Sequence, residues 1–515
     1  MEIFTISPSW LITTPLVFFM FYMFLHTLKS SKSSIKAPNL PPSPPKLPII
    51  GNLHQLFGKT RHQALWQLSK KYGPVMLLHI GSKPFLIISS PAMAKQVLKT
   101  QDHIFCSRPL SKSAKRLTYN YLDIAFSPQS AHRREKRKIL VSEFLSPKRA
   151  RSFNHVLVME IENVVRVLSL HPLNTHVNLS KMLLAMVKEV VCKVGFGKNY
   201  IEEPVKGISW EEILDEAVVM LDGSYSDNFP WLGRIFDMIT GWNRKLEKCF
   251  GNLDAYIQMI LDDHNNDAIA DISEDDKDFV HRLIELSSMA DASSNELTKE
   301  DVKALIMNVF TGGIDTTVAS LEWAMSEIAK SPRVMQKLQN EIRKKAGRIQ
   351  RVDQLDTTNM TYLKLVVKEA MRLHAPAPLL IPHESSSHCQ IYGYDVFPGT
   401  TTVINAWGIG IDPNTWGANA AEFYPERFEN VDVDSVGGGG NFEMLPFGGG
   451  RRSCPAINTA PATVELVIAN RLYWFDWGLP DGLKIEDLDM EEEGSLIIHK
   501  KLPLCLVPIK HNWED

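Results

Sequence analysis

The sequence predicts a mainly α fold with small β sheets, preceded by a single N-terminal transmembrane anchor. Three observations support this prediction. Most of the chain beyond residue 60 has the periodicity of helices, only short stretches have the pattern of strands, and one stretch near the N-terminus is apolar and uncharged. Hydrophobic residues make up 44% and charged residues 22% of the chain, a globular composition that excludes general disorder and simple repeats.

The apolar stretch runs from Trp10 to Leu28 and contains no Lys, Arg, Asp or Glu. At 1.5 Å per residue, a helix of this length is about 28 Å long, enough to cross a bilayer core. The residues before it carry only an acidic charge and lysines follow it, the opposite of a cleaved signal peptide. Because basic residues stay on the cytoplasmic side, we expect residues 1–29 to be a single-pass anchor in the endoplasmic reticulum membrane, with a cytosolic body.

Residues 30–60 are predicted to be a basic and proline-rich linker. Its prolines between positions 38 and 48 exclude a continuous helix and favour an extended spacer. Residues 61–515 form the body, in which no further domain boundary is visible. Its patterns predict helices at 62–71, 93–100, 147–170, 176–192, 209–222, 244–264, 299–330, 333–346 and 457–474, and strands at 75–80 and 85–88.

The composition also excludes several classes of function. A net charge of −3, from 56 basic and 59 acidic residues, gives no case for nucleic acid binding. The six cysteines include no C-x-x-C pair, which excludes a disulfide scaffold or a zinc ribbon. No G-x-G-x-x-G follows a predicted strand, so we expect no nicotinamide- or flavin-binding domain in this chain.

The most informative segment is the cysteine loop, residues 446–456, with the sequence PFGGGRRSCPA. Phe447, Gly450, Arg452 and Cys454 match the pattern F-x-x-G-x-R-x-C. Glycines let a backbone pass close to a flat cofactor, and an arginine can neutralise an anionic group on it. A cysteine at the start of the following helix, at 457–474, would have a stabilised thiolate. The alternative is a buried structural cysteine beside a glycine turn.

Three further motifs accompany this loop. Glu369 and Arg372 lie three residues apart, on one face of a helix, and Arg427 lies in the segment PERF. Gly312 and Gly313 weaken a long helical pattern, by about 1 kcal/mol per glycine. Together with the cysteine loop, these motifs resemble cytochrome P-450, the haem-thiolate monooxygenases, and in particular the plant microsomal type. The resemblance spans essentially the whole chain.

The resemblance implies a cytochrome P-450 fold for residues 61–515, with haem b as the cofactor and Cys454 as its axial thiolate ligand. Phe447, Gly448 and Arg452 are then expected to contact this cofactor. Because the chain has no NADPH-binding domain, electrons from NADPH are expected to arrive through a separate NADPH–cytochrome P-450 reductase. A basic helix surface around Arg134 resembles the docking site for that partner, although a solvated charge run is the alternative.

The resemblance also implies roles for the other motifs. Asp315 and Thr316 are expected to relay protons during the reaction, at a kink where the two glycines open a groove in the helix. Glu369, Arg372 and Arg427 are expected to form a buried charge triad with a structural role.

The sequence departs from the family pattern in three places. Arg133 stands where the family has a tryptophan that binds a haem propionate, with Arg137 four residues later. His383 and Ile411 each stand where related chains usually have arginine. Since arginine can also bind a carboxylate, we expect Arg133, Arg137 and His383 to contribute to cofactor binding. The departures leave the strength of that binding open.

The predicted reaction inserts one oxygen atom from dioxygen into an apolar small molecule of plant specialised metabolism, a terpenoid or a phenylpropanoid. The expected pocket is lined mainly by apolar residues: Thr311, Gly312, Ala377, Leu380, Ile381 and Leu496. Two alternatives stay open. One is a haem-thiolate enzyme that catalyses coupling, dehydration or rearrangement, and the other is a non-catalytic, membrane-tethered protein with a decayed haem site.

Overall fold

The computed structural model describes residues 38–200, 207–266, 277–288, 297–349, 351–429 and 442–513. The predicted anchor, residues 1–29, and the first part of the linker lie outside the described residues. Within the described ranges, the stretch Lys299–Lys330 is long and apolar enough to cross a membrane, but more than half of its most apolar window is buried inside the protein. A core helix meets the same criteria, so this stretch is weak evidence for a membrane span.

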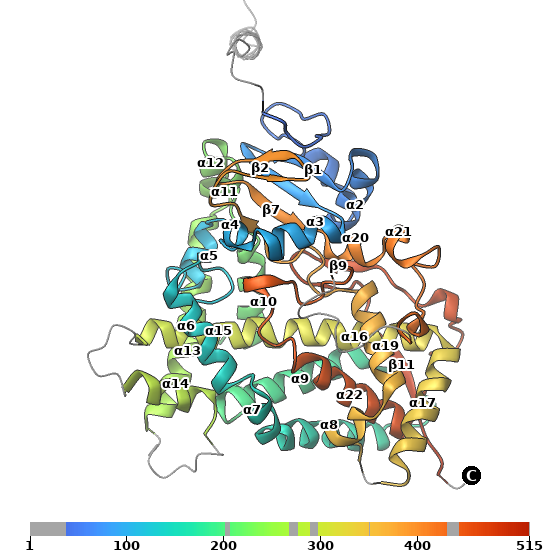
Figure 1. Cartoon of the computed structure of the whole chain (residues 1–515). Coiled ribbons are helices and arrows are strands. Elements are labelled where there is room, and N and C mark those ends of the chain that lie inside the picture. Colours follow the sequence, from blue (N-terminus) through green and yellow to red (C-terminus); the bar gives the residue numbers. More distant parts are fainter. Residues whose placement is uncertain are drawn as a thin grey trace, which may run out of the picture.

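Helices make up most of the body (Figure 1). The helices longer than one or two turns are α2 (Arg61–Tyr72), α6 (Ala131–Glu143), α8 (Asn154–Ser169), α9 (Leu179–Phe196), α10 (Trp210–Leu221), α12 (Leu232–Ile239), α13 (Trp242–Asn266), α14 (Phe279–Ser288), α15 (Lys299–Gly313), α16 (Asp315–Lys330), α17 (Pro332–Ala346), α19 (Thr361–Leu373) and α22 (Ala460–Trp474). The short ones are α3 (Pro91–Lys95), α4 (Asp102–Phe105), α5 (Lys112–Leu117), α7 (Pro147–Ser152), α11 (Tyr225–Asn228), α18 (Gln354–Thr358), α20 (Ala406–Gly410) and α21 (Pro413–Trp416), with single turns η1 (Leu53–Leu56), η2 (Gln96–Thr100), η4 (Pro425–Phe428), η6 (Gly450–Arg452) and η7 (Ile485–Asp487).

Helices α15 and α16 run through the middle of the body, and α9, α19 and α22 pack against α16 (Figure 1). Their sequences explain this position. From Val464 to Tyr473, all but one of the residues of α22 are buried, because the helix is apolar around nearly its whole circumference. The largest apolar cluster of the molecule is formed by these helices together with α10, α13 and α14.

Small sheets lie around this helical core. The largest has the strand order β1 (Val75–Ile80), β2 (Lys83–Ile88), β7 (Thr401–Ile404), β4 (His383–Glu384). Only the pairing of β2 with β7 is parallel among the described strands. The smaller sheets pair β10 (Ile498–Lys500) with β9 (Glu492–Gly494), β5 (Cys389–Ile391) with β6 (Tyr394–Val396), and β11 (Cys505–Lys510) with β3 (Val177–Asn178) and β8 (Phe475–Gly478).

The largest sheet lies at one end of the molecule, where the described part of the linker also runs (Figure 1). The linker has no regular structure over residues 38–46. It follows the sheet edge, since the N–H of Leu77 donates to the carbonyl of Pro42 at 2.9 Å. The N–H of Ser82, in the turn between β1 and β2, donates to the carbonyl of Asn228 in α11. Linker, sheet and α11 therefore share one end of the body.

Three predicted helices differ from the observed ones. The pattern at 299–330 forms two helices, because the chain breaks at Ile314 after the two glycines. The pattern at 147–170 also divides, at Phe153. The helix predicted from residue 457 begins at Ala460, so Cys454 lies in a loop six residues before it. The expected start of this helix was therefore wrong by three residues, whereas stabilisation of the thiolate by the helix and its amides stays a prediction.

Candidate functional site

The cysteine loop is closed by its own main chain. The N–H of Cys454 donates to the carbonyl of Phe447 at 2.8 Å, and the N–H of Gly448 donates to the carbonyl of Leu445 at 3.1 Å. Gly448 and Gly450 both have φ of +66°, where residues with a side chain are strained. A Cβ on Gly450 would lie 1.9 Å from the carbonyl oxygen of Leu98. The loop can pack against η2 only with glycine at this position.

The Cys454 side chain is a free thiol. Burial raises its pKa, while the N–H of Ala456 and the positive charge of Arg137 act in the opposite direction. Arg137 lies beside the loop, with its Nη2 3.4 Å from the hydroxyl of Ser453. The protein alone therefore leaves this thiol protonated at neutral pH. A bound metal cation would deprotonate it, as coordinating thiols are deprotonated.

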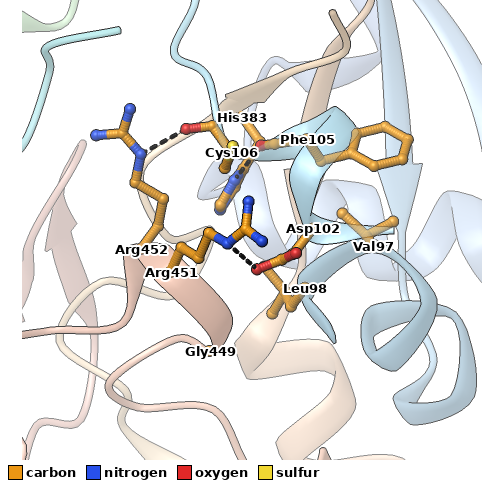
Figure 2. Close-up of a pocket in the computed structure, with 9 residues that line it drawn as sticks. All are labelled: Val97, Leu98, Asp102, Phe105, Cys106, His383, Gly449, Arg451 and Arg452. Atoms are coloured by element: carbon orange, nitrogen blue, oxygen red, sulfur yellow. Dashed lines mark hydrogen bonds and ion pairs between the residues drawn. The ribbon is translucent and has the colours of Figure 1, made fainter. Parts of the chain in front are cut away.

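Three buried arginines converge beside this loop. Arg452 donates to the carbonyl of Cys106 at 2.6 Å (Figure 2). It also donates to the carbonyl of Ser127 at 2.6 Å. Arg133 on α6 and Arg108 reach the same place and also bond only main-chain carbonyls or an amide within the described residues. Arg133 donates to the carbonyl of Ile124, which also lies 3.3 Å from Arg452. Sequence reasoning missed Arg108, because no motif in the chain connects it with the cysteine loop.

The arginines carry more positive charge than their surroundings balance. Burial and the repulsion from Arg133 lower the pKa of Arg452 to about 9, and burial and the repulsion from Arg137 lower that of Arg133 to about 10. Burial, followed by repulsion from Arg452 and Arg133, lowers the pKa of Arg108 well below its usual value. Asp123 is the carboxyl that offsets part of this charge.

His383 lies at the same pocket (Figure 2). Its Nδ1 is 2.8 Å from the carbonyl of Phe105, so this nitrogen carries the proton of the neutral ring. Burial, followed by the charges of Arg108 and Arg452, lowers the pKa of His383 well below its usual value. Arg452 and His383 line this pocket, and Arg133 lies beside Arg452, so three of the residues expected at the cofactor are close together. They offer several buried donors and an excess of positive charge, a donor set that fits two carboxylates of one ligand.

The break between α15 and α16 opens the helix as the two glycines predicted. Gly312 is exposed, and no atom lies within 4 Å of the position that a Cβ on it would take. Its carbonyl accepts a hydrogen bond from Oγ1 of Thr316 at 2.8 Å. Asp315 begins α16, beside this hydroxyl. The segment from Gly312 to Thr316 thus presents an open position, a carboxylate and a hydroxyl around the break between the two helices.

Comparison with known proteins identifies the family. The family model described as cytochrome P450 matches residues 41–506 of this chain. The chain is a cytochrome P450. It is 56% identical to parthenolide synthase from Tanacetum parthenium over 90% of each chain, and 46% identical to eupatolide synthase from Helianthus annuus over 91% of each. The fold also matches that of a zebra fish cytochrome P450 solved with abiraterone, with a TM-score of 0.71 at 21% identity, over 88% of this chain and 100% of that one.

Membership in this family confirms the predicted mainly α cytochrome P450 fold of the body and the predicted enzyme class. The protein is a haem-dependent monooxygenase of plant specialised metabolism, with haem b as cofactor and electrons supplied from NADPH by a separate reductase. The two alternatives left open by the sequence are not favoured by these relatives.

In this P450 the predicted charge triad is assembled and buried. Arg372 donates to both carboxylate oxygens of Glu369, at 2.7 and 2.8 Å. Arg427 donates to the same carboxylate at 2.8 Å. The side chains of Glu369 and Arg372 are 0% exposed and that of Arg427 is 7% exposed. Both arginines also bond main-chain carbonyls of residues 410–422, so the triad joins α19 to the segment before the cysteine loop.

The predicted pocket residues lie on three segments. Leu380 is next to the cysteine loop, because a Cβ on Gly448 would lie 3.7 Å from its Cδ1. Its N–H donates to the carbonyl of Ala377, and Ile381 follows it. Thr311 lies on α15, with its hydroxyl bonded to the carbonyl of Met307. Leu496 lies in the turn between β9 and β10, and β10 bonds the main chain of Pro376.

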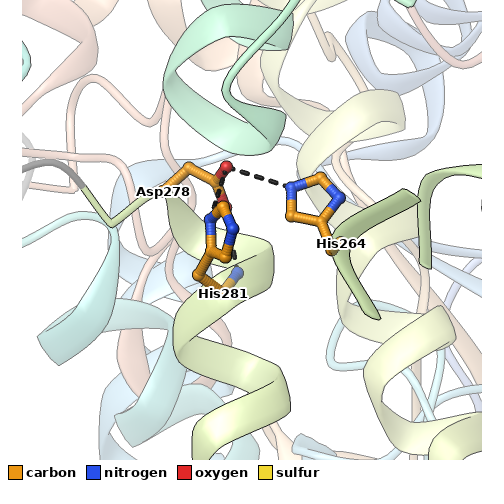
Figure 3. Close-up of side chains that lie close together, drawn as sticks. All are labelled: His264, Asp278 and His281. Atoms are coloured by element: carbon orange, nitrogen blue, oxygen red, sulfur yellow. Dashed lines mark hydrogen bonds and ion pairs between the residues drawn. The ribbon is translucent and has the colours of Figure 1, made fainter. Parts of the chain in front are cut away.

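A second cluster of titratable groups lies away from this site. Asp278 lies 3.0 Å from Nε2 of His264 and 2.9 Å from Nδ1 of His281 (Figure 3). The other ring nitrogen of His264 is 2.6 Å from the carbonyl of Ile260. Burial opposes ionisation of Asp278, but its hydrogen bonds to the two histidines outweigh burial and lower its pKa. These bonds join α13 to α14 and account for the cluster as a structural contact.

Proposed function

We propose that Cys454 is the axial ligand of the haem iron. The observation that carries this proposal is a partly buried free thiol beside an excess of buried positive charge, on a loop that needs glycine at position 450. Phe447 and Gly448 belong to the same loop, so they would lie beside the haem. Haem bound through a thiolate supplies an electron-rich iron that activates dioxygen. One oxygen atom enters the substrate, and the other leaves as water with two protons and two electrons.

The buried arginines, together with the neutral His383, would hold the haem propionates. Arg108, Arg133, Arg452 and His383 offer donors beside the cysteine loop, and two carboxylates would offset the burial and the mutual repulsion that lower the pKa of each arginine. Arg137 stands beside Ser453 and screens the thiolate. The replacement of the usual tryptophan and arginine by Arg133 and His383 thus leaves a site with enough donors for both propionates.

Asp315 and Thr316 deliver protons to the reaction. The Thr316 hydroxyl lies over the open groove at Gly312, and the Asp315 carboxylate is one third exposed, so it can exchange protons with solvent. The triad of Glu369, Arg372 and Arg427 has no part in this transfer. Its bonds to main-chain carbonyls support a structural role beneath the cofactor.

The substrate is a terpenoid, of the sesquiterpene lactone type. The two relatives at 56% and 46% identity are named for parthenolide and eupatolide, which are compounds of this type. The pocket residues Leu380, Ile381, Ala377 and Leu496 are apolar, as a largely hydrocarbon substrate requires. A charged metabolite would lose its hydration there without compensation.

One spectrum tests the haem ligand. Reduced wild type should give the carbon monoxide difference spectrum of a haem–thiolate, and Cys454→Ala should lose it. For the substrate, wild type is incubated with reductase, NADPH and a set of sesquiterpene lactones, with cinnamic acid as the phenylpropanoid control. We expect an oxygenated lactone, formed only when NADPH and reductase are both present. Turnover without them would instead favour rearrangement chemistry.

The chain is further proposed to be tethered to the endoplasmic reticulum membrane by residues 1–29, with residues 30–60 as the linker and the catalytic body in the cytosol. The uncharged stretch and the lysines that follow it support this topology. At the linker end of the body, α12 exposes large apolar side chains, including 89% of Trp231 and 72% of Ile239. Such a face is suited to rest on a bilayer surface.

The reductase is proposed to dock on α6. Arg134 and Lys138 of this helix are exposed, and 76% of the Lys138 side chain is accessible. Arg137, on the same helix, lies beside the cysteine loop. An acidic partner surface on α6 would therefore come close to the thiolate side of the cofactor.

A further inference from the structure

A histidine outside the predicted site contacts one of its carboxylates. His499 lies on β10, and its Nε2 is 2.9 Å from Oδ1 of Asp315. Its Nδ1 is 3.8 Å from Oε2 of Glu322. Asp315 and Glu322 are seven residues apart and therefore lie on one face of α16, two turns from each other. The imidazole of His499 lies between two carboxylates.

Neighbouring bonds fix the strand that carries His499. The indole N–H of Trp323, on α16, donates at 3.1 Å to the main-chain carbonyl that precedes His499. The N–H of Lys500 donates to Oε2 of Glu322 at 3.4 Å, and the hydroxyl of Ser180 donates to the other oxygen. The Glu322 carboxylate is therefore held in place, and His499 is held against α16.

The surrounding charges favour the protonated imidazolium. Burial opposes the charge, but the hydrogen bonds and charges of Asp315 and Glu322 outweigh burial and raise the pKa of His499 to about 9. Lys500 extends to the other face of the strand, over the ring of Trp323. On β9, Glu493 lies opposite His499 in the strand register. The two carboxylates that raise the pKa of His499, those of Asp315 and Glu322, both belong to α16.

The arrangement connects solvent with the groove between α15 and α16. The side chain of His499 is 29% exposed and that of Asp315 is 35% exposed. Thr316 directly follows Asp315, and its hydroxyl reaches the Gly312 carbonyl in the groove. A proton on Nε2 of His499 can therefore reach Asp315 across one hydrogen bond. Asp315 directly precedes Thr316, whose hydroxyl lies at Gly312.

We propose that His499 is a positioning residue of the reaction, which holds the Asp315 carboxylate beside Thr316 and resupplies it with protons from solvent. The proposal rests on the proton-delivery role given above to Asp315 and Thr316. The Nε2 proton of His499 first passes to Oδ1 of the Asp315 carboxylate, the protonated Asp315 then gives this proton up on the Thr316 side, and the neutral imidazole takes a replacement proton from solvent. Both residues return to their starting state, and no oxidant or reductant is needed for this transfer.

The test compares haem-loaded wild type with His499→Gln, which keeps a neutral N–H donor and has no titratable proton. The matched control is His511→Gln, because His511 is similarly exposed, at 26%, and lies 3.7 Å from Asp476. Reductase, NADPH and the sesquiterpene lactone that wild type oxidises are supplied. We expect His499→Gln to lower the product formed per NADPH consumed by about a hundredfold, the lower end of what a positioned proton-transfer group contributes. The missing electrons should appear as hydrogen peroxide, and the pH profile of this ratio should lose its step near pH 9.

A second readout needs no turnover. Since the folded pKa of His499 is raised, its charge stabilises the fold fully below pH 6.5, and this contribution is lost as the pH rises through about 9. Wild type should unfold at a higher temperature than His499→Gln at pH 6.5, and the difference should vanish above pH 9. Asp315→Asn should lose the same pH-dependent stability. This variant replaces His499→Gln in the measurement if His499→Gln does not fold.

Three outcomes separate the possibilities. Lower coupling in His499→Gln, together with the pH-dependent loss of stability, supports the proposal. Coupling and stability curves equal to those of His511→Gln overturn it. A wild type that lacks the haem–thiolate carbon monoxide spectrum overturns the proposed function instead, and that result is independent of His499.

Discussion

At the scale of single residues, the proposed propionate site includes Arg108, which no sequence motif singles out. Its guanidinium lies among the carbonyls of Ala125, Ile381 and Pro382 and repels Arg452. If it binds a propionate, Arg108→Ala should weaken haem retention about tenfold or more, because a hydrogen bond to a charged group contributes about 1.5–3 kcal/mol. Haem transfer to apomyoglobin measures this loss. Arg151→Ala, at an exposed site, is the control. If Arg108→Ala retains haem as well as wild type does, Arg108 binds only main-chain carbonyls and no propionate.

For Arg471, in contrast, we predict that a substitution stabilises the protein. It is fully buried in α22, and Nη2 donates to the sulfur of Met186, while Nε and Nη1 have no hydrogen-bond partner among the described residues. Burial lowers its pKa to about 10. Arg471→Leu should raise the free energy of unfolding by about 1–3 kcal/mol, since unsatisfied buried groups cost at least this much.

Thermal unfolding of the haem-loaded protein measures the effect of Arg471→Leu. Arg343→Leu is the opposing control, because Arg343 is bonded to Asp476 at 2.8 Å and to the carbonyl of Phe475. We expect that control to lower the unfolding temperature. A loss of stability in Arg471→Leu as well would mean that this guanidinium has an anionic partner.

At the scale of elements, the sequence predicts the elements with strong local signals. The strand pattern at 75–80 and the helix pattern at 333–346 agree with β1 and α17 within a residue. The break in 299–330 could not be located by apolar periodicity, which continues on both sides of the two glycines. The cysteine loop was recognisable from its residues, but the distance from Cys454 to α22 was not, because proline and turn residues between them form no helix.

The parts of the site that sequence reasoning missed depend on long-range contacts. Arg108 meets Arg452 from a segment more than three hundred residues away, and His499, on β10, meets Asp315 from another distant part of the chain. Neither contact has a spacing that a pattern could reveal. The triad was predictable, because Glu369 and Arg372 share one helix face and local geometry already joins them.

The cysteine loop itself gives a prediction at this scale. Gly450→Ala should lower the haem-loaded fraction and destabilise the protein by at least about 1–3 kcal/mol, because its φ is +66° and the new Cβ would clash with the carbonyl of Leu98. Gly482→Ala is the matched control, since Gly482 has φ of +83° and open space around it. The two variants share the conformational cost and differ in the clash. If Gly450→Ala and Gly482→Ala change haem loading and unfolding temperature equally, the clash with Leu98 makes no contribution.

At the scale of the whole molecule, the apolar face of α12 belongs to the same end of the body as the linker (Figure 1). Ile235, Phe236 and Ile239 are 50%, 51% and 72% exposed, and their spacing places them on one side of the helix, next to Trp231. The opposite side is buried, since Asp237 is 1% exposed. Side chains exposed to this extent in one stripe favour a second membrane contact besides the predicted anchor.

This contact predicts that a chain beginning at residue 38 still binds lipid vesicles. Changing Trp231, Ile235, Phe236 and Ile239 to Ser should weaken that binding about a hundredfold, because partial insertion of four such side chains contributes about 3 kcal/mol or more. Flotation with phosphatidylcholine–phosphatidylserine vesicles measures it. The matched control changes the exposed apolar residues at the end of α8 to Ser: Val167, Leu170 and Leu173. Since α8 lies at the other end of the body (Figure 1), equal losses in both variants would mean that general surface hydrophobicity, and not the position of α12, drives the binding.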